Sequence, residues 1–169
     1  MLLDIRKLFS APESAHPLQF AFDFSEEDFP GYRVGQPCEG SLEIGQEAHG
    51  RRLRLKLSAQ VCVDTECARC LAPVQATLPL ARTVLLRADD WQQSEEDLPL
   101  TEDGKLDVRE LVYTEILVTV PSTFLCDENC KGLCPVCGKV RALGCTCEEM
   151  SQWADPVTEN QLSIQLHLR

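Results

Sequence analysis

The sequence has few aromatic residues, few histidines and no long apolar run. Aromatic side chains make up 6% of its 169 residues, and there are 3 histidines. A membrane-spanning helix needs roughly 20 consecutive apolar residues, and the longest apolar runs of this chain are far shorter. Asp4 and Lys7 interrupt the start of the chain, where a secretion signal requires an apolar stretch. We therefore expect a soluble, cytoplasmic protein that does not contact a membrane.

Basic residues are also scarce relative to acidic ones. The chain has 16 Lys and Arg against 27 Asp and Glu, which gives a formal net charge of -11. Affinity for nucleic acid in general comes from net positive surface that releases counterions from phosphates. This charge therefore argues against a general nucleic-acid binder and favours a basic partner.

What the sequence does contain is a set of alternating segments typical of β-strands. Apolar and polar residues alternate with a period of two, which is the pattern of a half-buried strand, and glycine and proline separate the segments as turn residues do. The predicted fold class is α+β, a β-rich antiparallel meander or small barrel with one main helix. The alternating or apolar segments are residues 20–24, 42–44, 53–61, 74–80 and 83–86.

The main helix is predicted at Val108–Thr119. Asp107 is a good N-cap residue, and Glu110 stands three places later as a capping-box partner. Apolar residues then recur on one helical face, and Pro121 ends the helix.

The composition changes along the chain and predicts two parts. Residues 1–125 are expected to form a β-rich core domain, with a solvated acidic loop at 89–103. Residues 126–169 are expected to form a Cys-rich, zinc-bound segment with a C-terminal tail, packed on the core. The tail alternates at Leu162, Ile164, Leu166 and Leu168, which predicts a final strand.

The strongest chemical signal is the set of 10 cysteines. In a reducing cytoplasm they indicate metal binding in preference to disulfides. Two C-x2-C pairs have the spacing with which thiolates share a tetrahedral zinc ion, and two further pairs bring the candidate ligands to the number that two closed sites require. The candidates are Cys67, Cys70, Cys126, Cys130, Cys134, Cys137, Cys145 and Cys147.

The spacing leaves the partition of these ligands open between one or two structural Zn²⁺ ions. The most economical partition joins Cys134 and Cys137 to the nearby Cys145 and Cys147, and leaves the remaining four cysteines for a second site. In the alternative, the pair Cys67 and Cys70 meets the pair at 134 and 137.

No other catalytic motif is present in the sequence. The three histidines lie far from the cysteine pairs, whereas catalytic zinc sites usually include histidine and keep one open position. A redox pair of the thioredoxin type starts a helix after a strand, but Pro73 follows Cys70 closely and no helical period is visible there. The isolated Cys38 and Cys62 are expected to be small core residues. We expect no enzymatic activity and no small-molecule substrate.

One short segment is basic, although the chain as a whole is acidic. Arg52, Arg54 and Lys56 alternate with leucines, so three cations project from one face of a strand about 6.6 Å apart. Two interpretations remain open. The cations contact RNA phosphates, or they pair across strands with acids such as Glu39 and Glu43.

Several motifs together resemble the YceD-like family of bacteria and plastids. These motifs are CKGLCPVCG, preceded by Leu125-Cys126 and followed by Cys145-Thr146-Cys147, the segment ECARCLAPV, and the predicted helix before Pro121. The resemblance covers roughly residues 40–150. It implies a role in the accumulation of large-subunit ribosomal RNA, with no established chemical activity.

The expected function is therefore a non-catalytic factor in large ribosomal subunit assembly. Its partner would be a basic ribosomal protein, the pre-ribosomal large subunit or rRNA. The alternative is a zinc-dependent or redox-active cysteine protein unrelated to ribosomes.

Overall fold

The computed structural model describes residues 1–10, 17–47, 51–89, 98–145 and 147. The chain divides into two compact units, Met1–Cys130 and Lys131–Arg169. Cys126 and Cys130 thus lie in the first unit. The predicted tail strand, the three histidines and residues 90–97 of the acidic loop lie outside the described residues.

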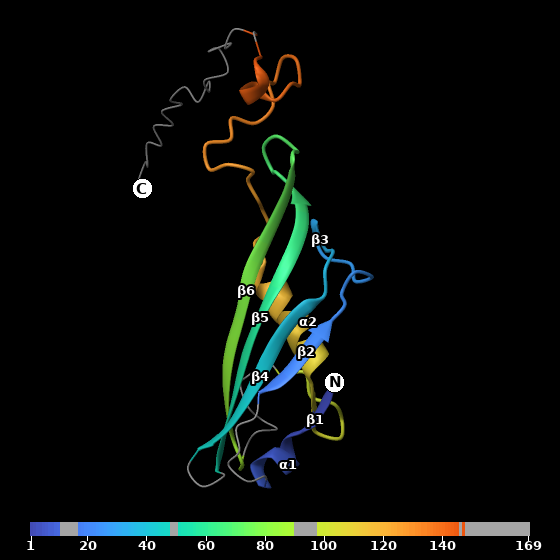
Figure 1. Cartoon of the computed structure of the whole chain (residues 1–169), viewed down its shortest axis with the longest axis vertical. Helices are drawn as coiled ribbons and strands as arrows, with labels where there is room; N and C mark the ends of the chain where they lie inside the picture. The colour runs from blue at the N-terminus through green and yellow to red at the C-terminus, as the bar shows by residue number, and fades with distance from the viewer. Residues whose placement is uncertain (11–16, 48–50, 90–97, 146, 148–169) are drawn as a thin grey trace, which may run out of the picture. The chain divides into compact units, whose positions relative to one another are not determined.

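The first unit contains a five-stranded antiparallel sheet built around the long strand β5 (Arg52–Glu66). On one side, β5 pairs with β4 (Cys38–Glu47) and then with the short β3 (Tyr32–Val34). On the other side it pairs over its whole length with β6 (Pro73–Arg87). Strand β2 (Leu18–Phe22) pairs with β4, and Figure 1 shows β2, β4, β5 and β6 side by side.

The predicted alternation holds along β5, where every second side chain from Leu53 to Val63 is buried. These side chains form the centre of the hydrophobic core. The apolar stretches 74–80 and 83–86 belong to one continuous strand, β6, because its pairing with β5 is unbroken from Pro73 to Arg87. The antiparallel, β-rich α+β class is confirmed.

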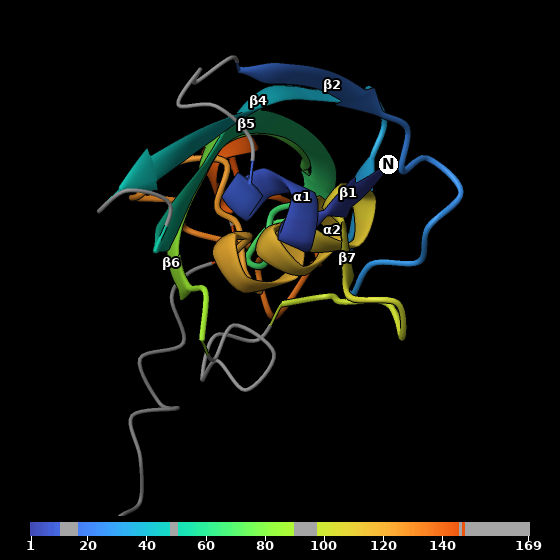
Figure 2. The same ribbon diagram turned by 90° about the horizontal axis from the view of Figure 1, so that it is seen from below.

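The helix α2 spans Val108–Thr119, as predicted. The Asp107 carboxylate caps it by accepting a hydrogen bond from the Arg109 amide at 3.0 Å. Figure 2 shows the sheet curving around this helix, whose apolar face enters the core. Glu115 is also buried on that face, where its carboxylate lies 3.8 Å from the Arg82 guanidinium of β6.

Short elements complete the first unit. Strand β1 (Leu2–Asp4) pairs with β7 (Lys105–Asp107), and α1 (Ile5–Ser10) follows β1. At the end of the predicted acidic loop, Leu98 and Leu100 are half-buried and pack against the core. Within the described ranges, no helix is long and apolar enough to cross a membrane.

Candidate metal centres

The first unit contains a cluster of four cysteines, which we call cluster 1: Cys67, Cys70, Cys126 and Cys130. Their four Sγ atoms all lie within 4.8 Å of one another. The Sγ atoms of Cys67 and Cys130 are 3.8 Å apart, and those of Cys70 and Cys126 are 3.5 Å apart. A disulfide has its sulfurs about 2.05 Å apart, so these are free thiols.

Cluster 1 forms because the β5–β6 turn lies beside the segment that follows α2. Cys67 follows directly after β5 and Cys70 lies within the turn. The Ala68 amide donates a 2.8 Å hydrogen bond to the Phe124 carbonyl, which ties the turn to the segment after the helix. The Arg69 guanidinium donates to the carbonyl of Cys130 at 2.9 Å. Ligand pairs far apart in the sequence are therefore held together by backbone contacts.

The second unit contains cluster 2: Cys134, Cys137, Cys145 and Cys147. Its four Sγ atoms also lie within 4.8 Å of one another, and those of Cys137 and Cys145 are 3.5 Å apart. A single 3-10 turn, Arg141–Leu143, separates the two halves of this cluster. Each cluster holds the four cysteines that the economical partition assigns to one ion.

The two C-x2-C turns have the same backbone geometry. In cluster 1, the Leu71 amide donates to the Cys67 carbonyl at 2.9 Å, and in cluster 2 the Gly138 amide donates to the Cys134 carbonyl at 2.8 Å. The residue that closes each turn is left-handed, with φ of 60° at Leu71 and 70° at Gly138. Glycine adopts this conformation freely, whereas leucine does so at a cost.

Backbone amides stabilise one thiolate in each cluster. A hydrogen bond from the Cys126 amide is the largest cause that lowers the pKa of Cys67 to about 6, and one from the Cys137 amide does the same for Cys134, whose pKa is also about 6. Hydrogen bonding with a neighbouring thiol raises the pKa of Cys126, and likewise that of Cys147, to about 12. Further thiolates in the same cluster therefore need a cation beside them.

Both clusters fit a tetrahedral metal ion. Zinc binds thiolates at about 2.3 Å, which places the ligand sulfurs of a tetrahedral site about 3.8 Å apart. The sulfur separations of 3.5 to 3.8 Å in cluster 1 match that value. The described residues therefore hold two groups that can bind a metal ion.

The predicted row of cations, which we call the cation stripe (Arg52, Arg54 and Lys56), lies on β5. Two of its members are ion-paired within the sheet. Arg54 Nη1 lies 3.4 Å from the Glu47 carboxylate, and Lys56 Nζ lies 3.5 Å from that of Glu43. Both acids are on β4. The expected partner Glu39 instead stands opposite Gln60.

Sequence reasoning missed two charged residues near these sites. Arg69, inside the first C-x2-C turn, bonds to the other half of cluster 1, and its place between the ligands was the available signal. Arg87 of β6 lies opposite Arg52 of β5. Only the strand register reveals this neighbour. The predicted core residue Cys38 is fully buried, and burial raises its pKa to about 11.

The fold and the clusters define a class of protein: a β-rich α+β domain with two cysteine clusters that can bind a metal ion. Within this class, the family model described as "Large ribosomal RNA subunit accumulation protein YceD" matches residues 55–157. This range covers more than half of the chain and includes both clusters. The chain belongs to the YceD family, which confirms the resemblance drawn from the cysteine motifs.

Comparison with individual proteins adds relatives without a described activity. An uncharacterized protein of Mycobacterium bovis and two of Mycobacterium tuberculosis are each 32% identical to this chain over 77 residues. The alignment covers 43% of this chain and 37% of each relative, so the chain spans little more than a third of their length. No solved structure matches.

Proposed function

We propose that this protein is a non-catalytic factor that promotes accumulation of large-subunit ribosomal RNA by binding a basic ribosomal protein. The observation that carries the proposal is the match of residues 55–157 to a family described by that accumulation role. That description names no enzymatic activity.

Charge favours a basic protein over RNA as the direct partner. The chain has a net charge of -11. Acids on β4 already pair with Arg54 and Lys56, two residues of the cation stripe that could contact RNA. Phosphate binding would have to compete with these carboxylates and with the overall negative field. The same field attracts a basic protein and steers its association.

The two cysteine clusters are proposed to hold one structural Zn²⁺ each. Four thiolates without a histidine or an open position are typical of closed structural zinc sites. Zinc bound there would supply cross-linking of the backbone. The cysteines of cluster 1 lie in a β-turn and in the segment after α2, whereas thioredoxin-type redox pairs start a helix. This arrangement favours a structural role over a redox role.

Metal analysis tests the zinc proposal directly. The purified protein is expected to contain two zinc ions per chain, and Cys67→Ser or Cys137→Ser is expected to reduce the content to one. Cys62→Ser is a matched control, because Cys62 lies on β5 outside both clusters. Zinc content that is unaffected by Cys67→Ser would remove that residue from the ligand set.

Purification of the tagged protein with and without ribonuclease tests the partner. Ribosomal proteins are expected to stay bound after the RNA is destroyed. They should also stay bound to the triple variant Arg52→Gln, Arg54→Gln and Lys56→Gln. If every partner disappears with the RNA, and the triple variant loses them too, direct rRNA binding replaces this proposal.

A further inference from the structure

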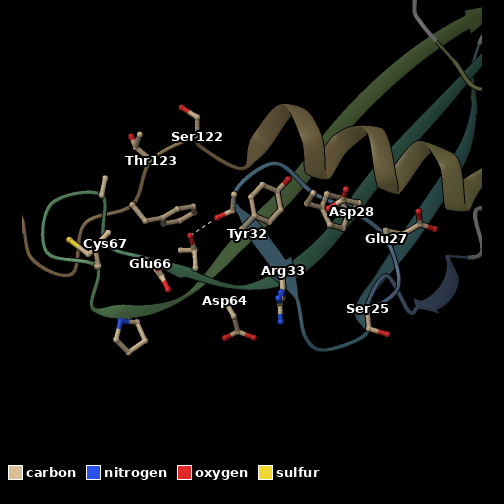
Figure 3. Close-up of a pocket in the computed structure, with 17 residues that line it drawn as sticks. Ser25, Glu27, Asp28, Tyr32, Arg33, Asp64, Glu66, Cys67, Ser122 and Thr123 are labelled. Carbon is tan, nitrogen blue, oxygen red and sulfur yellow. Dashed lines mark hydrogen bonds between the residues drawn. The ribbon is translucent and has the colours of Figure 1, made fainter.

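A cavity of about 820 Å³ opens beside the β5–β6 turn of the first unit. Three stretches of chain line it: residues 25–33, residues 64–73 at the end of β5 and through the first C-x2-C turn, and residues 122–124 after α2. Figure 3 shows Asp64, Glu66 and Cys67 along one side of it. Its volume is typical of sites that take a small ligand or a few residues of a peptide.

The lining of this cavity is strongly acidic. Four carboxylates and one guanidinium, that of Arg33, line it. Glu27 is engaged by Arg109, with 2.7 Å between the charged atoms. The Asp64 carboxylate accepts a 2.8 Å hydrogen bond from the side-chain amide of Gln75, which carries no charge. Asp28, Asp64 and Glu66 are all exposed, so negative charge faces the entering ligand.

The cavity also offers apolar surface and an unused polar group. Leu71 is 60% exposed, and Phe124 is half-buried beside the same turn. Tyr32 also lines the cavity. Its side chain is 7% exposed, and its hydroxyl has no hydrogen-bond partner among the residues that the structure describes.

Leu71 is informative because the second C-x2-C turn closes with Gly138 at the same place. Both residues are left-handed, and the leucine accepts a conformational cost that glycine avoids. Because this position is a leucine, the turn presents a large apolar side chain at the cavity.

We propose that this cavity, the acidic groove, binds a short basic segment of the protein partner. An arginine or lysine side chain would lay its methylene stem over Leu71 and Phe124 and place its charged head by Asp64 and Glu66. Such side chains bury their stems on apolar surface while the charge stays in a polar setting. The inference rests on the proposed function, because it names where the basic ribosomal protein would bind.

Cluster 1 fixes one wall of the groove. Cys67, Ala68 and Leu71 belong to both the turn and the lining, and the Ala68 amide holds the Phe124 carbonyl at 2.8 Å. Metal bound to cluster 1 would therefore keep the two apolar contacts in place.

Fluorescence anisotropy with defined probes tests the groove in the full-length protein. The basic probe is a labelled octapeptide of alternating arginine and alanine. The comparison probes are the glutamate–alanine peptide and a single-stranded RNA octamer. The groove variant carries Asp64→Asn and Glu66→Gln. A matched control carries Glu39→Gln and Glu102→Gln, which remove the same charge from exposed positions outside the groove.

The wild type is expected to bind the basic peptide and neither comparison probe. The groove variant should bind it about tenfold more weakly, and the control should match the wild type. Leu71→Asn keeps a residue that tolerates the left-handed turn and should weaken binding about threefold with zinc content unchanged. Equal weakening in both double variants would overturn the inference, because net charge alone would explain it. Absent peptide binding, or tighter binding of RNA, would also overturn it.

The ribonuclease-treated purification separates failure of the groove from failure of the function. If the groove variant retains the ribosomal proteins that the wild type captures, the groove is wrong and the proposed function stands. If the wild type itself captures none, the proposed function fails, and the peptide titration still decides whether the groove binds basic segments.

Discussion

The two cysteine clusters contain C-x2-C turns of the same geometry but join different kinds of segment. Cluster 1 joins residues as far apart as Cys67 and Cys130, which are 63 positions apart in the sequence. Cluster 2 lies entirely within residues 134–147. The turns themselves are alike, with amide-to-carbonyl bonds of 2.9 and 2.8 Å. With a metal ion bound, the same local geometry would therefore form a tertiary cross-link in one unit and the centre of a small fold in the other.

Burial accounts for this difference. The first unit has a hydrophobic core that runs from Ile5 to Val120 and would persist without a metal ion. Within residues 131–145 and 147, only Gly132 and Cys134 are buried. A segment without a core depends on its metal for folding, whereas a cross-link adds to a fold that already exists.

The largest effect is expected from Cys134→Ser. Loss of the second ion should abolish amide-exchange protection across residues 131–147, because metal binding provides most of the folding free energy of such segments. The unfolding midpoint of the first unit should not change. Protection that survives in the variant would show that cluster 2 does not organise its unit.

Cys70→Ser tests the other side of the comparison. Removing the cross-link between the β5–β6 turn and the segment after α2 should lower the free energy of unfolding of the first unit by about 2–5 kcal/mol. Urea denaturation monitored by circular dichroism measures this change, with Cys62→Ser as the control. An unchanged midpoint would mean that cluster 1 contributes no stability.

The closing residue of each knuckle provides a smaller and more specific test. Gly138→Ala should weaken zinc binding by cluster 2 about fivefold, because a left-handed alanine costs about 1 kcal/mol. Apart from Gly138 and its two chain neighbours, no heavy atom of the described residues lies within 4 Å of the added methyl group, so conformation is the cause. Leu71→Gly should leave zinc binding by cluster 1 unchanged or slightly tighter. Competition with a chelating dye measures both affinities, and weakening in both variants would contradict the shared geometry.

The smallest effect is expected from Arg69→Gln. The guanidinium donates to the Cys130 carbonyl at 2.9 Å, and a shorter neutral side chain would lose this bond. A loss of about 1 kcal/mol should raise the rate of zinc transfer from cluster 1 severalfold. Arg69 bonds to the ligand segment of cluster 1, so the zinc transfer rate of cluster 2 should not change.

Local features were predictable because short stretches of sequence specify them. The helix Val108–Thr119 begins at a residue that caps it and ends before Pro121. The alternation along β5 places its leucines in the core. The C-x2-C turns depend on hydrogen bonds between residues at most five positions apart.

Long-range features needed the tertiary structure. Glu115 is polar on an apolar helical face, and only its position opposite Arg82 of β6 explains its burial. Arg54 pairs with Glu47, and Glu39 lies away from the stripe, because strand register decides which charges meet. The acidic groove combines three stretches of chain that are distant in the sequence, which no local pattern joins.

By itself, the sequence determined that this protein is acidic, rich in β-strands and equipped with eight cysteines at knuckle spacing. The tertiary structure decided which cysteines meet, because the turn after β5 lies beside the segment after α2 only once the sheet has curved around the helix. The physical reason is that spacing specifies contacts along the backbone, whereas packing of the core specifies contacts between distant segments.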